Sequence, residues 1–381
     1  MRPPSPAAVV YASIEAISAA AWDRCFPGDP EGWAFYRAVE DAGPPGFEWR
    51  YIALLEDGQP VAVAPVFLTR YRLDTTVQGP LRRITEALAR TLPRLMTLNL
   101  AALGSPVAEQ CHLGFAPEVA EERKPAMLDQ LLDAFEDLAA AESCGLMAVK
   151  DASEADMPLW RSVAAGRGYQ AMPGLPTGVL KVPPGRLDAY LATLSRATRK
   201  DLKRKLRARE GVRVERRHAI DDLVAEVAAL YEETVANSEL QFEHLPPDYF
   251  AAVLRRLAPA ASMALYWADE RLVAFNLMIE TPTRLVDKYV GMHYPAVRRY
   301  NLYYLSWLEN VAYCAERGIG TYQSGQAFYG PKLRLGCRLS PNWLMFRHRR
   351  PALNATLRLV AKLVRLDRFD PEIARLMEEH A

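Results

Sequence analysis

A lysine that follows two turns of small residues is the first candidate for chemistry in this sequence. The stretch TYQSGQAFYGPK ends at Lys332, and the Gly-Pro pair directly before it interrupts regular structure. Upstream, Ser324, Gly325 and Gln326 follow a short expected strand, where free backbone N–H groups can meet a ligand. We predict that this turn and Lys332 hold a phosphate or an acyl carbonyl. A solvated surface turn is the alternative that the pattern leaves open.

Two similar segments indicate the elements that position this turn. Residues 49–68 and 263–279 each contain two apolar runs around an acidic turn, at Asp57 in the first and 212 residues later at Asp269 in the second. Each expected hairpin follows helical patterns and precedes a long helix, a glycine and a short strand. A repeat of about 200 residues indicates two α/β domains rather than a solenoid. We expect domains over residues 1–185 and 211–350.

A basic helix is expected between the two domains, over residues 186–210. One face of its first half is apolar, and its second half carries eight cations: Arg196, Arg199, Lys200, Lys203, Arg204, Lys205, Arg207 and Arg209. Arg199 and Lys203 lie four residues apart and therefore share a face. So dense a cluster favours a phosphate-bearing ligand, although a solvated face would show the same pattern.

Composition excludes several classes of protein. With 381 residues and 50% hydrophobic content the chain can bury full cores, and a net charge of +1 provides no global field for nucleic acid. The five cysteines are scattered and lack the paired spacing of a zinc site, which indicates a reducing compartment. No apolar run approaches the roughly 18 to 20 residues that span a bilayer. We expect a cytoplasmic protein without a bound metal.

Several short segments together resemble one family. Residues 287–291, DKYVG, are similar to a strand of type R-Y-W-G, and Ser324-Gly325-Gln326 with Lys332 and Gly336 is similar to a closing block of glycine, glutamine and lysine. On these residues and on the basic helix, the sequence resembles the tandem GNAT proteins related to the Fem peptidoglycan aminoacyltransferases and to the peptidogalycan biosynthesis or recognition proteins. The match is strongest over residues 196–348.

The resemblance implies an α/β fold of two tandem GNAT domains and an acyl transfer reaction. It implies that an acyl group moves from acyl-CoA or an acyl carrier protein, used as co-substrate rather than as a permanent cofactor, to a primary amine. The acceptor would be an amino acid, a peptide or a cell-envelope precursor. Two alternatives remain open, which are an aminoacyl-tRNA donor bound through the basic helix and a non-catalytic recognition protein.

The resemblance also implies roles for individual residues. The candidates for proton transfer and catalysis are Glu243, His244, His293 and Lys332. The candidates for acceptor binding are Glu239, Asp287, Lys288 and Tyr289, of which Asp287 and Lys288 are adjacent on one strand and should face opposite sides. The candidates for donor binding are Arg199, Lys203, Arg298, Arg299, Ser324, Gly325, Gln326 and Lys332.

One departure from the family concerns the phosphate loop. The segment between Gly291 and Tyr300 reads MHYPAVRR and contains no glycine, whereas the usual loop brings backbone N–H groups close to a pyrophosphate. This departure keeps open the alternative that donor binding has been lost.

The last segment, residues 351–381, is expected to be a basic helical tail. Leu353 and Leu357 belong to its apolar stripe, and its cations lie elsewhere. Docking on its own domain and peripheral contact with a membrane surface are both consistent with this pattern.

Overall fold

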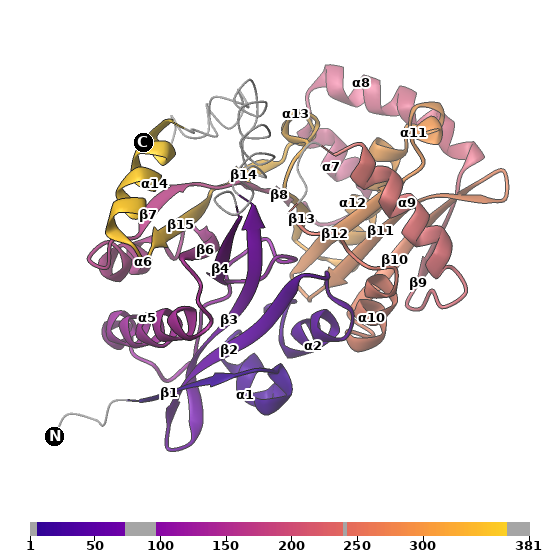
Figure 1. Ribbon diagram of the computed structural model, residues 1–381. Coiled ribbons are helices and arrows are strands. Elements are labelled where there is room, and N and C mark those ends of the chain that lie inside the picture. The colour runs from indigo at the N-terminus through magenta and orange to yellow at the C-terminus, as the bar shows by residue number, and fades with distance from the viewer. Residues whose placement is uncertain (1–5, 73–96, 239–241, 364–381) are drawn as a thin grey trace. The chain divides into compact units, whose positions relative to one another are not determined.

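The computed structural model of the chain describes residues 6–72, 97–238 and 242–363 (Figure 1). These residues form two compact units. The first unit consists of residues up to Tyr36, Pro44–Pro176 and the chain from Pro341 onward, and the second consists of Arg37–Gly43 and Thr177–Ser340. Each unit contains one mixed sheet with helices. The expected α/β class is therefore confirmed.

The sheet of the first unit has the described strand order β1-β2-β3-β4-β6-β15-β7, with β5 paired to β3. Among the described strands of this sheet, only β4 and β6 pair in parallel. Its strands are β1 (Ala7–Tyr11), β2 (Phe47–Glu56), β3 (Gln59–Arg72), β4 (Thr97–Leu103), β5 (Gly114–Phe115), β6 (Leu146–Ser153), β7 (Gln170–Pro173) and β15 (Asn342–His348). Its helices are η1 (Ile14–Ala16), α1 (Ala19–Arg24), the first part of α2 (Trp33–Ala42), η2 (Glu121–Arg123), α5 (Lys124–Ala141), α6 (Met157–Ala164) and α14 (Pro351–Leu363).

The sheet of the second unit has the described strand order β14-β8-β13-β12-β11-β10-β9. Here β12 and β13 form the parallel pair. Its strands are β8 (Thr177–Lys181), β9 (Arg213–Arg217), β10 (Ala261–Ala268), β11 (Arg271–Glu280), β12 (Arg284–Met292), β13 (Thr321–Gly325) and β14 (Arg338–Ser340). Its helices are α7 (Leu187–Thr193), α8 (Arg196–Lys205), η3 (Leu206–Gly211), α9 (Val224–Ala236), α10 (Asp248–Arg256), α11 (Tyr294–Tyr300), α12 (Leu302–Arg317) and α13 (Tyr329–Arg334).

The two predicted hairpins occupy equivalent places in the two sheets. In the first, Asp57 and Gly58 have φ values of 48° and 75°, and in the second Asp269 and Glu270 have φ values of 49° and 58°. Positive φ at both central residues gives the two-residue turn whose twist suits a hairpin. The order β1-β2-β3-β4-β6 matches β9-β10-β11-β12-β13. The repeat seen in the sequence is therefore a repeat of topology.

The unit boundaries differ from those expected at residues 185 and 350. β8 follows the first half of the chain but pairs with β13 and β14 in the second sheet. β15 follows the second half but pairs with β6 and β7 in the first sheet. Each sheet thus takes one strand from the other half of the sequence, because strand pairing and not chain order decides which sheet a segment completes.

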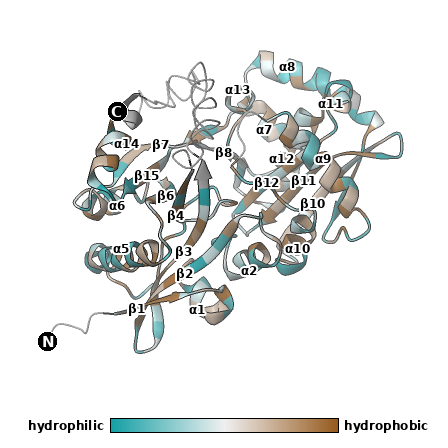
Figure 2. Cartoon of the chain, viewed as in Figure 1, coloured by the Kyte–Doolittle hydropathy of each residue, from teal (hydrophilic) through white to brown (hydrophobic). Residues whose placement is uncertain are grey.

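The segment 186–210 is not one helix, and it is part of the second unit rather than a bridge. The chain leaves α7 at Leu194, and Ser195 starts α8 by accepting a hydrogen bond from the Thr198 N–H at 3.1 Å, an N-cap. α7 packs on α12, and the Tyr190 hydroxyl donates to the Leu335 carbonyl at 2.8 Å. The apolar face of α7 is buried in the unit's core, whereas α8 is coloured as largely hydrophilic in Figure 2.

The tail forms helix α14 over Pro351–Leu363, and its continuation to residue 381 lies outside the described residues. Leu357 packs against the first unit's sheet, whereas Leu353 and Leu359 are 43% and 60% exposed. None of the helices within the described residues combines the length and the apolar content needed to cross a bilayer.

Candidate active site

The second unit has a point at which its two parallel strands stop pairing. β12 and β13 pair only through Arg284–Thr321, Leu285–Tyr322 and Val286–Gln323. From Asp287 onward, the edge of β12 that faces β13 has no strand partner among the described residues. We call this point the splay. In open α/β sheets, ligands bind outside the carboxyl ends of the strands, which is where the splay lies.

A β-bulge at Lys288 changes which side chains face the two sides of the sheet. Leu277 and Met278 of β11 are consecutive, yet they oppose Tyr289 and Asp287, so Lys288 is the extra residue. Asp287 faces α12, whereas Tyr289 reaches the opposite face beside α9 and α10. In a regular strand, residues two apart share a face. The expected simple alternation through Asp287 and Lys288 is thus replaced by the bulge, and Lys288 is buried.

Asp287 lies at the centre of a hydrogen-bond network beneath α12. Its carboxylate accepts bonds from the Tyr322 hydroxyl at 2.7 Å, from Asn276 Nδ2 at 2.9 and 3.0 Å, and from Asn310 Nδ2 at 3.2 Å. Asn276, Asn310 and Tyr322 are each at most 2% exposed. We did not predict these three residues. The available signal was an asparagine inside an apolar strand and another inside an apolar helix, since buried amides need partners.

Tyr289 and Glu243 meet on the other face of the sheet. The Tyr289 hydroxyl donates to Glu243 Oε1 at 3.2 Å. Burial, together with the neighbouring Glu243 charge, raises the pKa of Tyr289 well above its usual value, so the phenol keeps its proton. The rings of Tyr231, Tyr249 and Phe250 surround Tyr289 with centroid distances of 5.8 to 6.2 Å. The structure therefore brings the predicted Glu243 and Tyr289 together.

The two candidate histidines each contact a glutamate of α9. His244 Nε2 lies 2.8 Å from Glu232 Oε1, and His293 Nδ1 lies 2.9 Å from Glu233 Oε2. Glu233 also accepts the Tyr294 N–H at 2.8 Å. Burial opposes ionisation of Glu233, but these two hydrogen bonds and the histidine charge outweigh it and lower its pKa. Both imidazoles are about half exposed and are oriented by α9.

Lys332 is buried, with 4% of its surface exposed. Its ammonium donates to the carbonyls of Gly325 at 2.8 Å and Gln326 at 3.1 Å. Ser324 Oγ donates to the Gly178 carbonyl at 3.2 Å. The expected turn exists, but its lysine binds the backbone of the turn, whereas we had expected it to face a phosphate. A buried ammonium needs several acceptors, and the nearest carbonyls supply them.

The residues expected to bind the donor differ in their contacts and in their exposure. The Arg199 guanidinium donates to the carbonyls of Ala192 at 3.0 Å and Leu194 at 2.8 Å, and so caps the C-terminus of α7. Arg298 and Arg299 are exposed at the end of α11, and Arg299 lies 3.3 Å from Asp269. Glu239, expected to bind the acceptor, lies outside the described residues.

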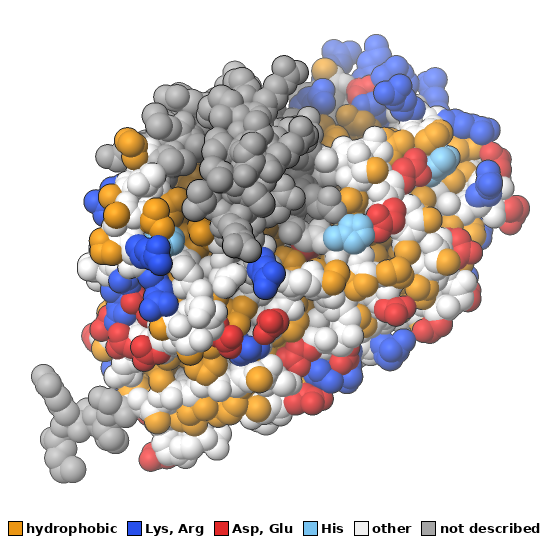
Figure 3. All heavy atoms as spheres, viewed as in Figure 1, with side chains coloured by type: hydrophobic (Ala, Val, Ile, Leu, Met, Phe, Trp, Pro, Cys, Tyr) orange, Lys and Arg blue, Asp and Glu red, His pale blue; other side chains and the backbone are white. Residues whose placement is uncertain are grey.

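The basic segment formed by α8 and η3 packs beside α12. Lys205 Nζ sits 3.3 Å from the centroid of the Tyr304 ring in the first turn of α12, and Arg209 pairs with Glu309 at 2.6 Å. Four exposed cations have no ion pair with another described residue: Arg196, Lys200, Lys203 and Arg207. Figure 3 shows the Lys and Arg side chains gathered over α8. A cationic surface therefore adjoins α12.

The corresponding place in the first unit is taken by the chain itself. β4 and β6 pair in parallel up to Leu103–Val149. Beyond that pair, the Cys111 N–H donates to the Asp151 carbonyl, and Lys150 Nζ donates to the Ala108 carbonyl, both at 2.8 Å. The loop after β4 thus lies against the edge of β6, and the equivalent of the splay is filled.

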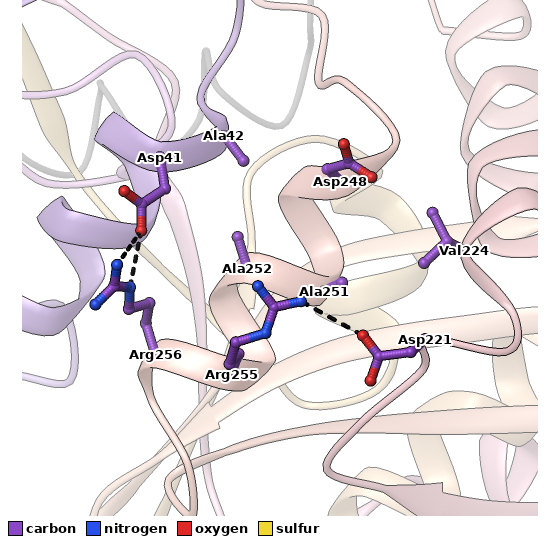
Figure 4. A pocket seen from close by; sticks show the side chains of 9 residues that line it. All are labelled: Asp41, Ala42, Asp221, Val224, Asp248, Ala251, Ala252, Arg255 and Arg256. Carbon is purple, nitrogen blue, oxygen red and sulfur yellow. Dashed lines mark hydrogen bonds and ion pairs between the residues drawn. The ribbon is translucent and has the colours of Figure 1, made fainter.

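A cavity of about 420 Å³ lies elsewhere in the second unit, beside α10 (Figure 4). Its lining is charged and largely paired, with Arg256 bound to Asp41 at 2.7 Å and Arg255 at 3.4 Å from Asp221. Its lining residues lie on α10, at the end of α2, at the start of α9 and, for Asp221, in the segment just before α9, and none of them lies on β12 or β13. We assign it no chemical role.

All five cysteines are free and buried, and burial raises the pKa of the Cys337 thiol. Within the described residues, no group of three or more His, Cys, Asp or Glu side chains is arranged to bind a metal.

The repeated sheet, with a parallel strand pair that splays in the second unit, has the arrangement of a GNAT-type fold. Residues 195–332 match the acetyltransferase (GNAT) domain family. The chain is similar to the crystal structure of FemX, with a TM-score of 0.56 and 14% identity over 89% of this chain and 96% of that one. It is also similar to L-PGS from Bacillus licheniformis, with a TM-score of 0.50 and 14% identity over 88% of this chain and 97% of that one.

A third similar structure is a tandem GNAT protein from the clavulanic acid biosynthesis pathway. Its TM-score is 0.50, with 13% identity over 91% of this chain and 99% of that one. Among curated proteins, none matches the sequence. At such identities the likeness concerns the fold, and the fold is that of two tandem GNAT domains.

Proposed function

We propose that this chain is an N-acyltransferase that moves an acyl group from a thioester to a primary amine at the splay of the second unit. The observation that carries the proposal is the loss of pairing between β12 and β13 after Val286 and Gln323. It leaves backbone groups of β12 available to an extended ligand. The donor is an acyl-CoA or an acyl carrier protein, whose phosphates are attracted by the exposed cations of α8.

The chemistry required is attack of a neutral amine on the thioester carbonyl carbon. The new C–N bond forms, the C–S bond breaks, and the sulfur leaves as a thiolate that takes up a proton. Glu243 is the proposed proton acceptor for the amine, because it lies on the face opposite α12 and is oriented by Tyr289 at 3.2 Å. Backbone N–H groups on the edge of β12 beyond Val286 are the proposed donors to the carbonyl oxygen as it gains negative charge.

Lys332 has a supporting role in this proposal. By binding the carbonyls of Gly325 and Gln326 it fixes the chain where β13 ends. A cytoplasmic location is part of the proposal and is supported by the five buried free thiols. Contact of α14 with a membrane surface is a further option, which the exposed Leu353 and Leu359 favour.

An aminoacyl-tRNA donor is the second candidate, and the cluster of unpaired cations on α8 favours it. In that case the bond broken is an ester C–O bond, and thioesters are not consumed. A non-catalytic recognition protein is the third candidate, in which neither donor is consumed.

The test is transfer by the purified protein. Acetyl-CoA and octanoyl-CoA are each mixed with a panel of free amino acids and short peptides. Free thiol is measured with a chromogenic disulfide, and the N-acyl product is identified by mass. Glu243→Gln should lower the rate by about 10² or more, whereas Glu226→Gln, an exposed acid on α9, should leave it unchanged. Consumption of aminoacyl-tRNA without thiol release would move the assignment to the second candidate.

A further inference from the structure

The turn between β13 and α13 has an unusual backbone. Gly325, Ala327 and Phe328 have φ values of 79°, 64° and 56°. Glycine adopts this left-handed region freely, but alanine does so at a cost, and a bulky phenylalanine there is an outlier. Lys332 binds the carbonyls of Gly325 and Gln326. A buried lysine therefore holds a strained turn directly after the strand that borders the splay.

The strained turn exposes an aromatic ring. Phe328 is 68% exposed, more than any other large apolar residue among those described. The centroid of its ring lies 5.8 Å from that of Tyr303, in the first turn of α12. Tyr303 lies on α12, which follows β12 and α11, and Phe328 is the residue directly before α13, which follows β13. The two rings thus join the segments that continue from the two splayed strands.

The phenol of Tyr303 adds a polar group to this pair. Its hydroxyl is buried and has no hydrogen-bond partner among the described residues. Burial raises the pKa of Tyr303, so the phenol stays protonated and can donate. An exposed apolar ring next to an unpaired buried donor is a combination suited to a ligand with an apolar part beside a polar atom.

We propose that Tyr303 and Phe328 form an aromatic gate that contacts the acyl group of the donor and selects for acyl groups with apolar surface. The inference rests on the proposed function and specifies its donor. The phosphates of the donor would be drawn to the cations of α8, whereas an uncharged ring offers them nothing. The acyl chain is the part of the donor that gains from burial against Phe328. Backbone strain of the kind seen at Ala327 and Phe328 is characteristic of ligand-binding turns.

The experiment compares acetyl-CoA with octanoyl-CoA. Phe328→Ala should lower kcat/KM for octanoyl-CoA about tenfold and for acetyl-CoA less than about twofold. Phe328→Leu keeps apolar surface and should retain at least about one third of the octanoyl activity. Ala327→Gly relieves strain at the neighbouring position but keeps the ring, so its ratio of octanoyl to acetyl activity should equal that of the wild type.

Three outcomes would overturn the gate. An equal loss of kcat/KM with both donors in Phe328→Ala, together with a lower melting temperature, would show that the ring only stabilises the fold. Unchanged kinetics in Phe328→Ala would show no contact with the donor. Phe328→Ala could also lose kcat/KM with both acyl-CoA donors but not with the matching acyl-pantetheines, which lack the nucleotide. That result would show that the ring contacts the nucleotide and not the acyl group.

Direct binding separates this inference from the proposed function. If the wild type releases no thiol from any thioester, the proposed function fails. Calorimetric affinities for octanoyl-CoA and acetyl-CoA still test the gate in that case. Wild type should then prefer octanoyl-CoA, and Phe328→Ala should lose that preference. Equal affinity of the wild type for both donors would refute the gate.

Discussion

The hydroxyl of Tyr322 donates to the carboxylate of Asp287 at 2.7 Å, joining β13 to the first residue of β12 beyond their last paired position. The side-chain amide of Asn310 on α12 donates to Asp287 Oδ2 and to the Tyr322 hydroxyl oxygen, at 3.2 Å each. The network thus links two strands and one helix at the splay. Removal of any one side chain of this network should therefore lower the free energy of unfolding, because a buried polar group left without its partner is costly.

Removal of the Tyr322 hydroxyl tests this network. Tyr322→Phe should lower the free energy of unfolding by about 1 to 3 kcal/mol, because Asp287 and Asn310 each lose a partner. Tyr266→Phe is the matched control, since Tyr266 is equally buried and its hydroxyl has no partner among the described residues. That change should be neutral or stabilising. Urea unfolding followed by circular dichroism measures both, and equal effects would contradict the role of the network.

Lys332→Met should disturb the turn after β13. The change removes two charge-assisted bonds and leaves the carbonyls of Gly325 and Gln326 short of donors. We expect a lower melting temperature and a loss of at least about tenfold in kcat/KM for thiol release. Lys181→Met is the control, because Lys181 is exposed and makes one bond at 3.2 Å to Thr321. Full activity in the Lys332→Met protein would show that the site does not depend on Lys332.

The cations of α8 should steer the donor. Arg199 caps the C-terminus of α7, and its replacement would disturb that helix as well, so the informative variant is Arg196→Ala with Lys200→Ala and Lys203→Ala. Its affinity for acyl-CoA should fall at low salt and approach that of the wild type near 0.5 M salt, where exposed charges are screened within several Å. A charge-matched variant changes Arg349, Arg350 and Arg358, which are exposed in the first unit. An equal loss of affinity for acyl-CoA in both variants would show that the net charge of the protein, and not the position of these cations on α8, attracts the donor.

His348 should make stability depend on pH. It is buried at the end of β15, its Nδ1 accepts the Arg350 N–H at 2.9 Å, and burial lowers its pKa below the usual value of about 6.5. As pH falls below about 6.5, the unfolded chain takes up a proton that the folded chain resists, so stability declines. His348→Asn keeps an acceptor and cannot titrate.

The wild type should accordingly lose more stability than His348→Asn between about pH 7 and pH 5. The other histidines are common to both proteins, so their contributions cancel in the difference. Unfolding midpoints in urea at a series of pH values measure it. Parallel curves for the two proteins would show that His348 titrates normally in the folded state.

Local patterns in the sequence were sufficient for the features that local physics decides. The turns at Asp57 and Asp269 were predictable because a two-residue hairpin needs residues that tolerate positive φ. The end of α12 was predictable from Gly318, which has a φ of 72°. The repeat of these signals in both halves predicted two similar α/β domains, and the fold confirms them.

Features that depend on distant partners appeared only in the tertiary structure. The helix expected over residues 186–210 breaks at Ser195, since a buried Leu194 and an N-cap outweigh the continuous helical pattern. Chain order gave no sign that β15 would complete the first sheet. Asp287 bonds to a residue 35 positions away, and the bulge at Lys288 is defined by its partner strand.

Local sequence patterns were therefore enough to predict the hairpin turns, the end of α12 and the repeated domain, and to show which residues can carry charge or protons. The tertiary structure decided which of those residues meet: Tyr289 with Glu243, Lys332 with its own turn, Arg199 with α7. The reason is physical. Turn geometry and apolar periodicity act over a few residues, whereas the pairing of buried polar groups is fixed by whichever partners packing brings within about 3 Å.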